Sequence, residues 1–321
     1  MVQAIQQQRP DVRITWIIGK IESQLLQGLE NIEFIVFDKK GGKAAIQALK
    51  ASMQGRHFDV LLMMQVALRA NWVSRVIPAQ IRLGFDSARS KELHAWFTTH
   101  TIAPQEHAHV LDGFMGFAAA LGITIEPPQW NMPLAKEDLT FADQAAAEWG
   151  DYVVICPAAS KAERCWLPER YAQIGDELSH AGKRVVLCGS PANLDVSLAQ
   201  AIEQKTNCDV VNMVGKTTLK QLLALLANAQ LVIAPDTGPA HMATTMGTAV
   251  IGLYAHSNPR RTGPYNNLNQ VVSVYDSVIL QQTGKHWQNL VWGKRAKGAS
   301  LMGLIGVDEV LAQAKALLAI Q

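Results

Sequence analysis

The sequence predicts an α/β protein with two doubly wound, Rossmann-like domains, each a parallel sheet covered by helices. Short runs rich in β-branched residues alternate with amphipathic stretches along the whole chain, which is the pattern of strand–helix–strand units. The 321 residues are too many for one typical core. A proline-rich stretch at 126–133 separates two alternating series. We therefore expect one domain at 1–147 and a second at 148–321.

The first series begins with a helix rather than a strand. Residues 2–8 predict the end of a helix, whereas a doubly wound domain normally begins with a strand whose following loop binds ligand. We expect this central first strand to be missing, which leaves a neighbouring strand with unpaired backbone groups and an apolar edge. The rest of the series predicts strands at 12–18, 32–38, 58–65 and 80–86 and helices at 43–54, 67–77 and 107–121.

The second series follows a helix predicted at 141–149. Its apolar runs and turn signals are again typical of a parallel sheet. They predict strands at 152–157, 184–189, 210–214, 230–233 and 249–255 and helices at 168–181, 192–204, 219–229, 238–246 and 307–320.

Composition excludes several classes of function. A net charge of +2 gives no reason to expect a nucleic-acid partner. The four cysteines have no C-x-x-C spacing, and Cys156 and Cys188 fall in apolar runs, so we expect buried free thiols and a reducing cytoplasm. No uninterrupted apolar run approaches about 18 residues and no signal peptide is evident, so we expect a soluble or at most peripheral protein.

Motifs for dinucleotides and metals are absent from the sequence, so no cofactor is predicted. No G-x-G-x-x-G follows a strand, and no Asp-x-Asp pair offers carboxylates to a metal-bound nucleotide. His107 and His109 lack a third ligand, so we expect helix-surface histidines rather than zinc. The segment 214–218 resembles part of a P-loop, but Val210 stands where that loop needs glycine, and we expect Thr218 to cap a helix.

A candidate anion site lies where the strand at 230–233 meets the helix at 238–246. Thr237 and Gly238 open this helix, so free backbone N–H groups and the positive end of the helix dipole converge there. Asp236 lies at the tip of the strand, and His241 falls on the same face of the first turn. The alternative is an ordinary helix start with a core histidine.

Two basic segments offer further anion-binding groups. Ser160, Lys161 and Arg164 follow the first strand of the second series and complement a diphosphate, although a solvated loop is the alternative. In the first series, cations suit an anionic acceptor, although solvated helix faces would explain them equally. These cations are Arg69, Arg75, Arg82, Arg89 and Lys91.

The motifs resemble those of the ADP-heptose:lipopolysaccharide heptosyltransferases, glycosyltransferase family 9. The resemblance rests on segments 10–20, 82–86, 157–166, 234–243, 247–254 and 258–265. It implies a GT-B fold whose two domains face a cleft, with an acceptor domain at 1–147 and a donor domain at 148–321. It also implies metal-independent, inverting transfer of heptose from ADP-L-glycero-D-manno-heptose to the Kdo/heptose inner core of lipopolysaccharide, in the cytoplasm and in peripheral contact with the inner membrane.

The resemblance also implies roles for individual residues. Ser160, Arg164, Thr237, Gly238 and His241 would bind the donor diphosphate, with Lys161 beside them, and Asp236 would hold heptose hydroxyls. Asn193 is the nearest match to a ribose-binding glutamate of the family, and the acceptor would meet Arg69, Arg82 and Arg89. The general-base aspartate belongs to a Gly-Asp loop expected upstream of Met1. Two alternatives stay open: a remnant that binds nucleotide sugar without turnover, and a GT-B enzyme for another nucleotide sugar.

Overall fold

A computed structural model describes residues 1–320, and the chain divides into two units, Met1–Pro133 and Leu134–Gln321. This division precedes the boundary expected at 147/148, because helix α6 (Lys136–Trp149) packs against α9 (Leu219–Asn228) in the second unit. The sequence predicted α6 only from residue 141, since Leu139 is the one apolar residue among its first five and is itself exposed.

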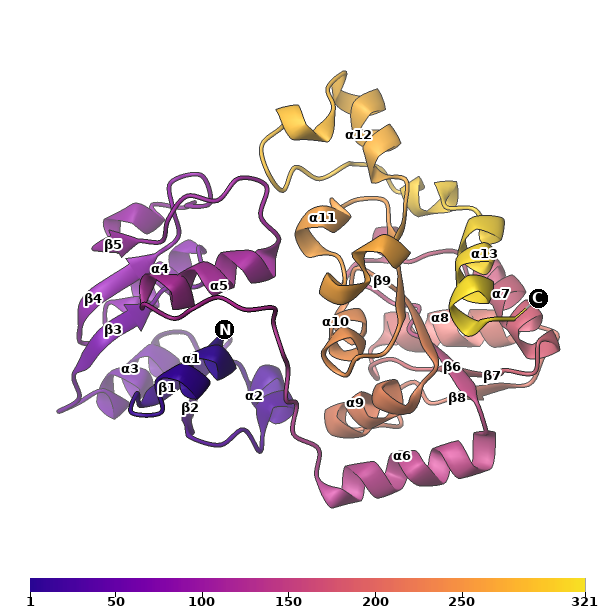
Figure 1. The fold of residues 1–321 in the computed structure, drawn as a ribbon, viewed down its shortest axis with the longest axis horizontal. Helices are drawn as coiled ribbons and strands as arrows, with labels where there is room; N and C mark the ends of the chain where they lie inside the picture. The colour runs from indigo at the N-terminus through magenta and orange to yellow at the C-terminus, as the bar shows by residue number, and fades with distance from the viewer. Residues whose placement is uncertain (321) are drawn as a thin grey trace. The chain divides into compact units, whose positions relative to one another are not determined.

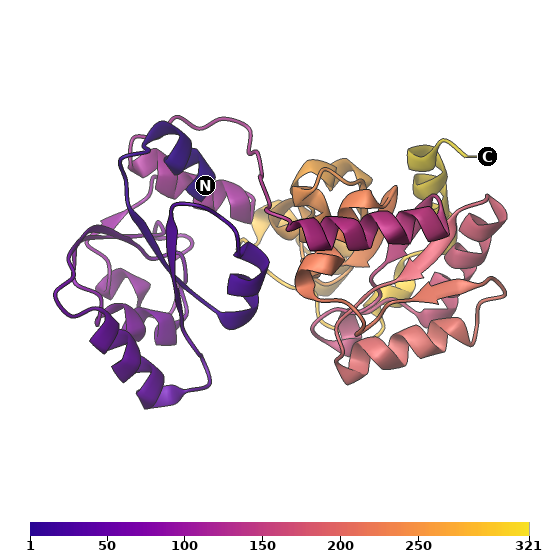
Figure 2. The ribbon, with the colours of Figure 1, turned by 90° about the horizontal axis from the view of Figure 1, so that it is seen from below.

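The second unit is built on a six-stranded parallel sheet with helices on both faces (Figure 1, Figure 2). The strand order is β11-β10-β9-β6-β7-β8, and all neighbouring strands are parallel, as predicted. The strands are β6 (Tyr152–Ile155), β7 (Arg184–Leu187), β8 (Val210–Asn212), β9 (Leu231–Pro235), β10 (Val250–Tyr254) and β11 (Val272–Ser273). The other helices are α7 (Pro168–His180), α8 (Asn193–Glu203), α10 (Gly238–Thr245), α11 (Pro259–Thr262), α12 (Tyr275–Thr283) and α13 (Val307–Leu318).

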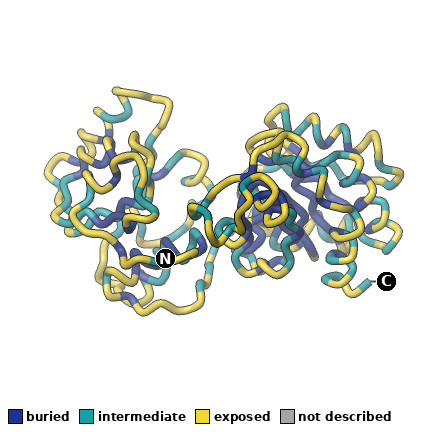
Figure 3. Tube along the Cα trace, turned by 90° about the horizontal axis from the view of Figure 1, so that it is seen from above, coloured by how far each residue is buried: buried dark blue, intermediate teal, exposed yellow. Residues whose placement is uncertain are grey.

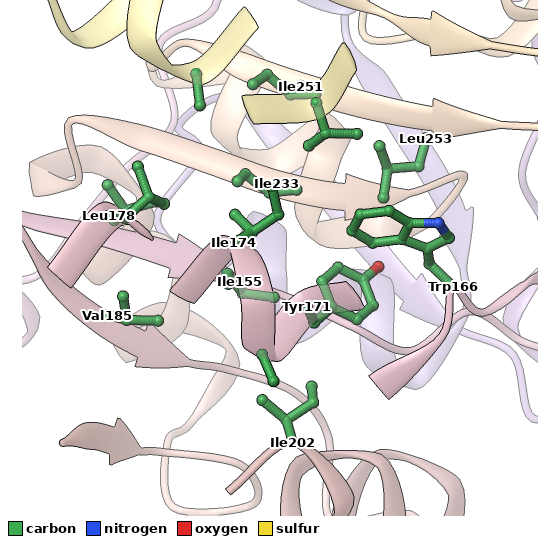
Figure 4. Close-up of a cluster of buried hydrophobic side chains, with 14 of the residues drawn as sticks. Ile155, Trp166, Tyr171, Ile174, Leu178, Val185, Ile202, Ile233, Ile251 and Leu253 are labelled. Carbon is green, nitrogen blue, oxygen red and sulfur yellow. The ribbon is translucent and has the colours of Figure 1, made fainter. Parts of the chain in front are cut away.

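The core of the second unit lies between this sheet and helices α7, α8 and α13. Four central strands (β6, β9, β10 and all but the first residue of β7) are fully buried, because helices cover both faces of a parallel sheet. Figure 4 shows Ile155, Ile233 and Ile251 on neighbouring strands, close to the rings of Trp166 and Tyr171. Those two rings meet edge to face with centroids 5.0 Å apart. The indole N–H of Trp166 also donates to the carbonyl of Ile305, 3.2 Å away.

Two local predictions about the second unit are confirmed. The Thr218 hydroxyl accepts from the Gln221 N–H at 3.1 Å and so caps α9. Cys156 and Cys188 are buried free thiols.

The first unit contains five parallel strands in two separate sheets. Strands β1 and β2 form one sheet, and β3, β4 and β5 form the other. The strands are β1 (Ile14–Ile18), β2 (Ile32–Val36), β3 (Phe58–Leu62), β4 (Ala79–Gly84) and β5 (His100–Thr101). The helices are α1 (Val2–Gln8), α2 (Lys20–Leu26), α3 (Gly42–Ser52), α4 (Leu68–Ser74) and α5 (Val110–Ala120).

Side chains, not backbone hydrogen bonds, connect these two sheets. Within residues 1–320, β1 pairs only with β2 and β3 only with β4, so each has one edge without a strand partner. Ile17 and Leu61 pack into one apolar cluster, while Ile5 of α1 packs with Ile14 and Leu62 in another. Figure 3 shows that most residues of the first unit are exposed or half-buried, including those of β1 and β3. The interior of the second unit is coloured as buried.

Two details of the first unit differ from expectation. The sequence did not predict α2, because this helix of seven residues buries none of its side chains. His109 is not a helix-surface histidine: it is buried at the start of α5, and its Nδ1 accepts from the Leu111 N–H at 3.0 Å. The imidazole therefore caps the helix as an aspartate or asparagine would.

Two fully buried tyrosines of the second unit provide a matched test of hydrogen bonding. The Tyr152 hydroxyl donates to the Leu225 carbonyl at 2.7 Å, whereas the Tyr171 hydroxyl has no partner among the described residues. Tyr152→Phe should lower the free energy of unfolding by about 0.5–1.5 kcal/mol, because it removes one buried hydrogen bond and leaves the Leu225 carbonyl only its bond from the Ala229 N–H. Tyr171→Phe should be neutral or stabilising. Urea unfolding at neutral pH measures both, and a larger loss for Tyr171→Phe would contradict the assignment.

A buried histidine makes the stability of the first unit depend on pH. His94 Nδ1 lies 2.8 Å from the Asn71 amide oxygen, and Nε2 lies 3.3 Å from the Phe85 N–H. Nε2 must therefore accept, Nδ1 carries the proton, and burial lowers the pKa of this imidazole. Protonation of Nε2 would place its N–H directly opposite the Phe85 N–H, which is unfavourable.

Because the folded-state pKa of His94 lies below its unfolded value of about 6.5, unfolding takes up a proton as the pH falls. The stability contributed by neutral His94 is present above pH of about 6.5 and is lost as the pH falls towards the folded pKa. We expect His94→Gln to show a shallower loss of unfolding free energy between about pH 7 and 5 than the wild type. His57→Gln, at an exposed histidine, is the control and should keep the wild-type slope.

Candidate functional site

The centre of the second sheet is a point where the chain reverses direction across the strand order. From β6 the chain runs outward to β7 and β8, then returns to β9 on the other side of β6 and runs outward to β10 and β11. Ligands of open α/β sheets bind beyond the carboxyl ends of the strands at such a switch point. The loops after β6 and β9 flank it, so the topology brings the two predicted anion-binding segments, 158–168 and 236–241, to the same edge of the sheet.

The loop after β9 leads directly into helix α10. Thr237 is its N-cap residue, with extended backbone (φ −150°, ψ 163°), and its side chain makes no capping hydrogen bond. Gly238 is exposed, and a Cβ at this position would meet no atom within 4 Å. The first-turn N–H groups of α10 therefore lie beside open space and lack a side-chain cap, which suits an anion at this end of the helix.

Asp236 lies half-buried beside this helix start, next to Tyr254 at the end of β10 and Ser257 after it. One carboxylate oxygen accepts from the Ser257 hydroxyl at 2.6 Å, and the other lies 3.4 Å from the Tyr254 hydroxyl. That hydroxyl has one proton and donates it to the Thr262 carbonyl at 2.8 Å. Burial raises the pKa of Tyr254 well above its usual value, and the carboxylate raises it further. Asp236 thus keeps oxygen lone pairs available for a ligand.

His241 lies one turn into α10 and its side chain is exposed. The protein atoms that surround the ring lower its pKa, and the Asp236 carboxylate opposes this shift. The imidazole is therefore neutral near pH 7, with one donor and one acceptor nitrogen. It offers a hydrogen bond to a ligand rather than a fixed charge.

Arg261 is a site residue that the sequence analysis missed. Its side chain is half-buried, and among residues 1–320 its guanidinium has no hydrogen-bond or ion-pair partner. Burial lowers the pKa of Arg261, and the negative charge of Asp236 opposes the shift, which places the two groups within electrostatic reach. Gly293, at φ +88°, passes close to it, because a Cβ there would lie 3.0 Å from Nε of Arg261.

The adjacent Arg260 has a different environment. Its two terminal nitrogens each donate to Asp276 at 2.9 Å, and its guanidinium lies 4.6 Å from the centroid of the Trp287 ring. The sequence showed an Arg-Arg pair within 258–265 but carried no signal for which arginine would remain unpaired.

The loop after β6 presents polar side chains at the same sheet edge. Ser160 and Lys161 are exposed, and Arg164 is half-buried at the end of a short 3-10 helix, Ala162–Arg164. The Cys165 thiol is tied to the loop backbone, since its Sγ accepts from the Ala159 N–H at 3.2 Å. Lys161 lies 3.8 Å from the Glu163 carboxylate, an exposed and therefore weak ion pair. These groups are free to meet a ligand.

Asn193 is exposed in the first turn of α8, after β7, the other neighbour of β6. The same first turn carries Asp195, whose carboxylate accepts from the Ser190 N–H at 2.8 Å. Asn193 therefore lies beyond the same sheet edge as the two anion-binding segments.

The three predicted acceptor arginines have different environments in the first unit. The Arg82 guanidinium donates to the carbonyls of Ser74, Ile77 and Phe97, and burial lowers its pKa. Arg89 pairs with the buried Asp86 and donates to Gln105 at 2.8 Å. Arg69 is exposed, with one bond of 3.2 Å to the Lys39 carbonyl. The structure thus gives Arg82 and Arg89 partners within the fold and leaves Arg69 accessible.

Residues 1–320 include no helix whose length and apolar character would let it cross a bilayer.

Comparison with known proteins agrees with this geometry. Residues 46–288 match the family model described as glycosyltransferase family 9 (heptosyltransferase). Over 317 residues the chain is 41% identical to the lipopolysaccharide core heptosyltransferase OpsX of Haemophilus influenzae, which covers 99% of this chain and 91% of that protein.

Solved structures agree on the fold. A glycosyl transferase of family 9 from Veillonella parvula superposes with a TM-score of 0.80 at 22% identity, covering 99% of this chain and 92% of that one. The ADP-heptose lipopolysaccharide heptosyltransferase II of Escherichia coli gives 0.72 at 18% identity, with the same coverage of 99% and 92%. The fold class is therefore GT-B, as predicted. The chain belongs to glycosyltransferase family 9, the heptosyltransferases.

Proposed function

We propose that this protein transfers heptose from ADP-L-glycero-D-manno-heptose to the Kdo- or heptose-bearing inner core of lipopolysaccharide. The observation that carries the proposal is the corner at Asp236, Thr237 and Gly238. There an uncapped helix start and a carboxylate lie side by side at the switch point of the second sheet. This pairs a site for a diphosphate with a site for sugar hydroxyls, which together make up a nucleotide sugar. The 41% identical relative is itself named as a lipopolysaccharide core heptosyltransferase.

The donor diphosphate would bind to the backbone N–H groups at 237–238. Ser160, Lys161, Arg164 and His241 would surround it, and Arg261 adds a guanidinium that has no protein partner among the described residues. Asn193 would approach the nucleoside. When the bond between C1 of heptose and the diphosphate breaks, ADP leaves with its negative charge. The dipole of α10 and the cations around it would already point at this charge and would not have to move to stabilise it. The proposed reaction therefore needs no divalent metal.

Asp236 would hold the heptose through its hydroxyl groups. The Ser257 hydroxyl fixes one carboxylate oxygen, which orients the other towards a ligand. With the sugar fixed, the acceptor hydroxyl attacks C1 from the face opposite the diphosphate, so the configuration inverts, and its proton passes to a general base. We assign no described residue to that base.

The acceptor would bind in the first unit, and Arg69 is the accessible one of the three predicted arginines. Since inner-core lipopolysaccharide is a lipid, the enzyme would work at the cytoplasmic face of the inner membrane and touch it peripherally.

The unpaired Arg261 provides a test of the donor site. Arg261→Gln should weaken ADP binding about 10- to 100-fold, because a hydrogen bond to a charged group contributes about 1.5–3 kcal/mol. The matched control, Arg260→Gln, removes the neighbouring guanidinium, which is already paired with Asp276, and should change the Kd less than about threefold.

Titration calorimetry with ADP, AMP and UDP measures these effects. The loss in Arg261→Gln should be larger for ADP than for AMP, which lacks the second phosphate. No ADP binding by the wild type would contradict the donor site itself. ADP binding without heptose transfer would indicate the non-catalytic remnant, and tighter binding of UDP would indicate another nucleotide sugar.

The Asp236 carboxylate provides a test of the proposed sugar site. Asp236→Asn should lower kcat/KM for heptose transfer about 10- to 100-fold, because the variant loses charge-assisted hydrogen bonds to sugar hydroxyls. The Kd for ADP should stay within about threefold, since ADP has no heptose. Ser257→Ala leaves the carboxylate in place and should cost less than about 10-fold in kcat/KM. Wild-type kcat/KM in Asp236→Asn would rule out the proposed role.

A further inference from the structure

Four large apolar side chains are exposed together on the first unit. Trp96 is 81% exposed, Trp72 55%, Leu93 52% and Leu68 38%. We call these four residues the aromatic patch. The aromatic patch contains both of the tryptophans that are exposed in residues 1–320. Clustered exposed apolar residues on a folded protein indicate an interaction surface rather than chance exposure.

Helical spacing aligns the members of the aromatic patch. Leu68 and Trp72 are four residues apart on α4 and therefore share one face. Leu93 is the N-cap residue of the 3-10 helix His94–Trp96, and its carbonyl accepts from the Trp96 N–H at 2.9 Å, so the two residues lie within one turn. The Trp72 ring contacts Phe97, the residue after Trp96, edge to face at 5.4 Å. The two pairs therefore form one continuous surface.

Polar contacts hold the two segments together. The Glu92 carboxylate accepts from the Leu68 N–H, and Asn71 donates to the Glu92 carbonyl at 3.2 Å. Asn71 also contacts His94 at 2.8 Å, underneath the patch. Glu92 and Leu93 both have left-handed backbone, with φ of 50° and 61°. Strained backbone of this kind persists only where surrounding contacts impose it, and here it presents Leu93 to solvent.

The charge around the aromatic patch is positive. Segments 68–75 and 91–97 contain the cations Arg69, Arg75 and Lys91 and a single acid, Glu92, which is bound to the Leu68 N–H. The Arg75 guanidinium lies 5.3 Å from the Trp72 ring centroid and 5.7 Å from that of Phe97. Its apolar stem and planar cation thus extend the aromatic surface and carry charge at its border.

We propose that the aromatic patch docks this protein onto an anionic phospholipid surface. Tryptophan rings favour the interface between headgroups and acyl chains, leucines bury in the acyl region, and arginine and lysine attract anionic headgroups. A free saccharide would instead require polar side chains directed outward, and the four members of the patch offer none beyond the indole N–H groups. The inference rests on the proposed function in one respect: a lipid-linked acceptor places the enzyme at a membrane.

Vesicle cosedimentation tests the proposal with the full chain. Vesicles of phosphatidylcholine containing about one third phosphatidylglycerol should bind the wild type at about 0.1 M NaCl, and binding should fall several-fold at about 0.5 M NaCl or on pure phosphatidylcholine. The double variant Leu93→Ser/Trp96→Ser should bind at least tenfold more weakly, and Lys91→Glu a few-fold more weakly. The control Val291→Ser removes a 76% exposed apolar side chain from the second unit and should bind like the wild type.

A second measurement reports insertion directly. Lipids brominated near the headgroup should quench wild-type tryptophan fluorescence, and Trp96→Phe should lose part of this quenching while ADP affinity stays unchanged. Wild-type protein that ignores anionic vesicles, or a double variant that binds them equally well, would overturn the proposal. So would loss of binding to a soluble, phosphorylated inner-core saccharide in the double variant with vesicle binding intact. Loss of ADP binding in the wild type would instead count against the donor site and leave the vesicle result standing.

Discussion

The structure depends on one constraint, the need to hydrogen-bond every backbone group of a buried parallel sheet. In the second unit this requires six strands running the same way, each connected to the next by a helix that covers one face. All strand-to-helix loops then emerge at a single edge. The order β9-β6 at the centre separates the two loops that flank the switch point, and this separation creates space for a ligand. Fully buried strands such as β6 and β9 make that edge rigid, so the loops can place groups accurately.

This edge of the sheet combines one carboxylate, which is fixed by a hydrogen bond, with positive groups that have no protein partner among the described residues. Asp236 is held by the Ser257 hydroxyl and lowers the local potential, while the start of α10 and the Arg261 guanidinium raise it. A half-buried cation without a partner costs free energy, which a dianionic ligand would recover on binding. Arg260 shows the alternative fate of a cation in the same helix, namely an ion pair with Asp276 and a stack on Trp287. Two adjacent arginines of helix α11 thus differ: Arg260 is paired within the fold, whereas Arg261 has no partner among residues 1–320.

The first unit obeys the same constraint less completely. Its strands form two sheets joined by apolar side chains, and β1 and β3 each keep one edge without a strand partner in the described chain. Arginine side chains provide partners for polar groups outside the strand pairing. Arg82 donates to three backbone carbonyls, and Arg89 neutralises the buried Asp86. The Asn71–His94 pair links α4 to the segment that carries Trp96. The fold therefore gives Arg82 and Arg89 internal partners, whereas Arg69 and Arg75 are exposed beside the aromatic patch.

The sequence by itself determined the order and type of most elements, the parallel sheets, and the strand–turn–helix corner at Asp236, because periodicity and helix-start residues are local signals. It also carried the family resemblance, since short motifs are linear. It missed α2, whose side chains are all exposed or half-buried, and placed the division of the chain after α6 had begun, because the first turn of α6 is polar. Tertiary structure decided which cation is free. Arg82 and Arg89 find partners within their own segment, and Arg260 pairs with Asp276, whereas Arg261 has no partner among residues 1–320. It also decided that the loops after β6 and β9 are neighbours, and that Leu68 and Trp96 share one surface, since pairing across the fold leaves no mark on local sequence.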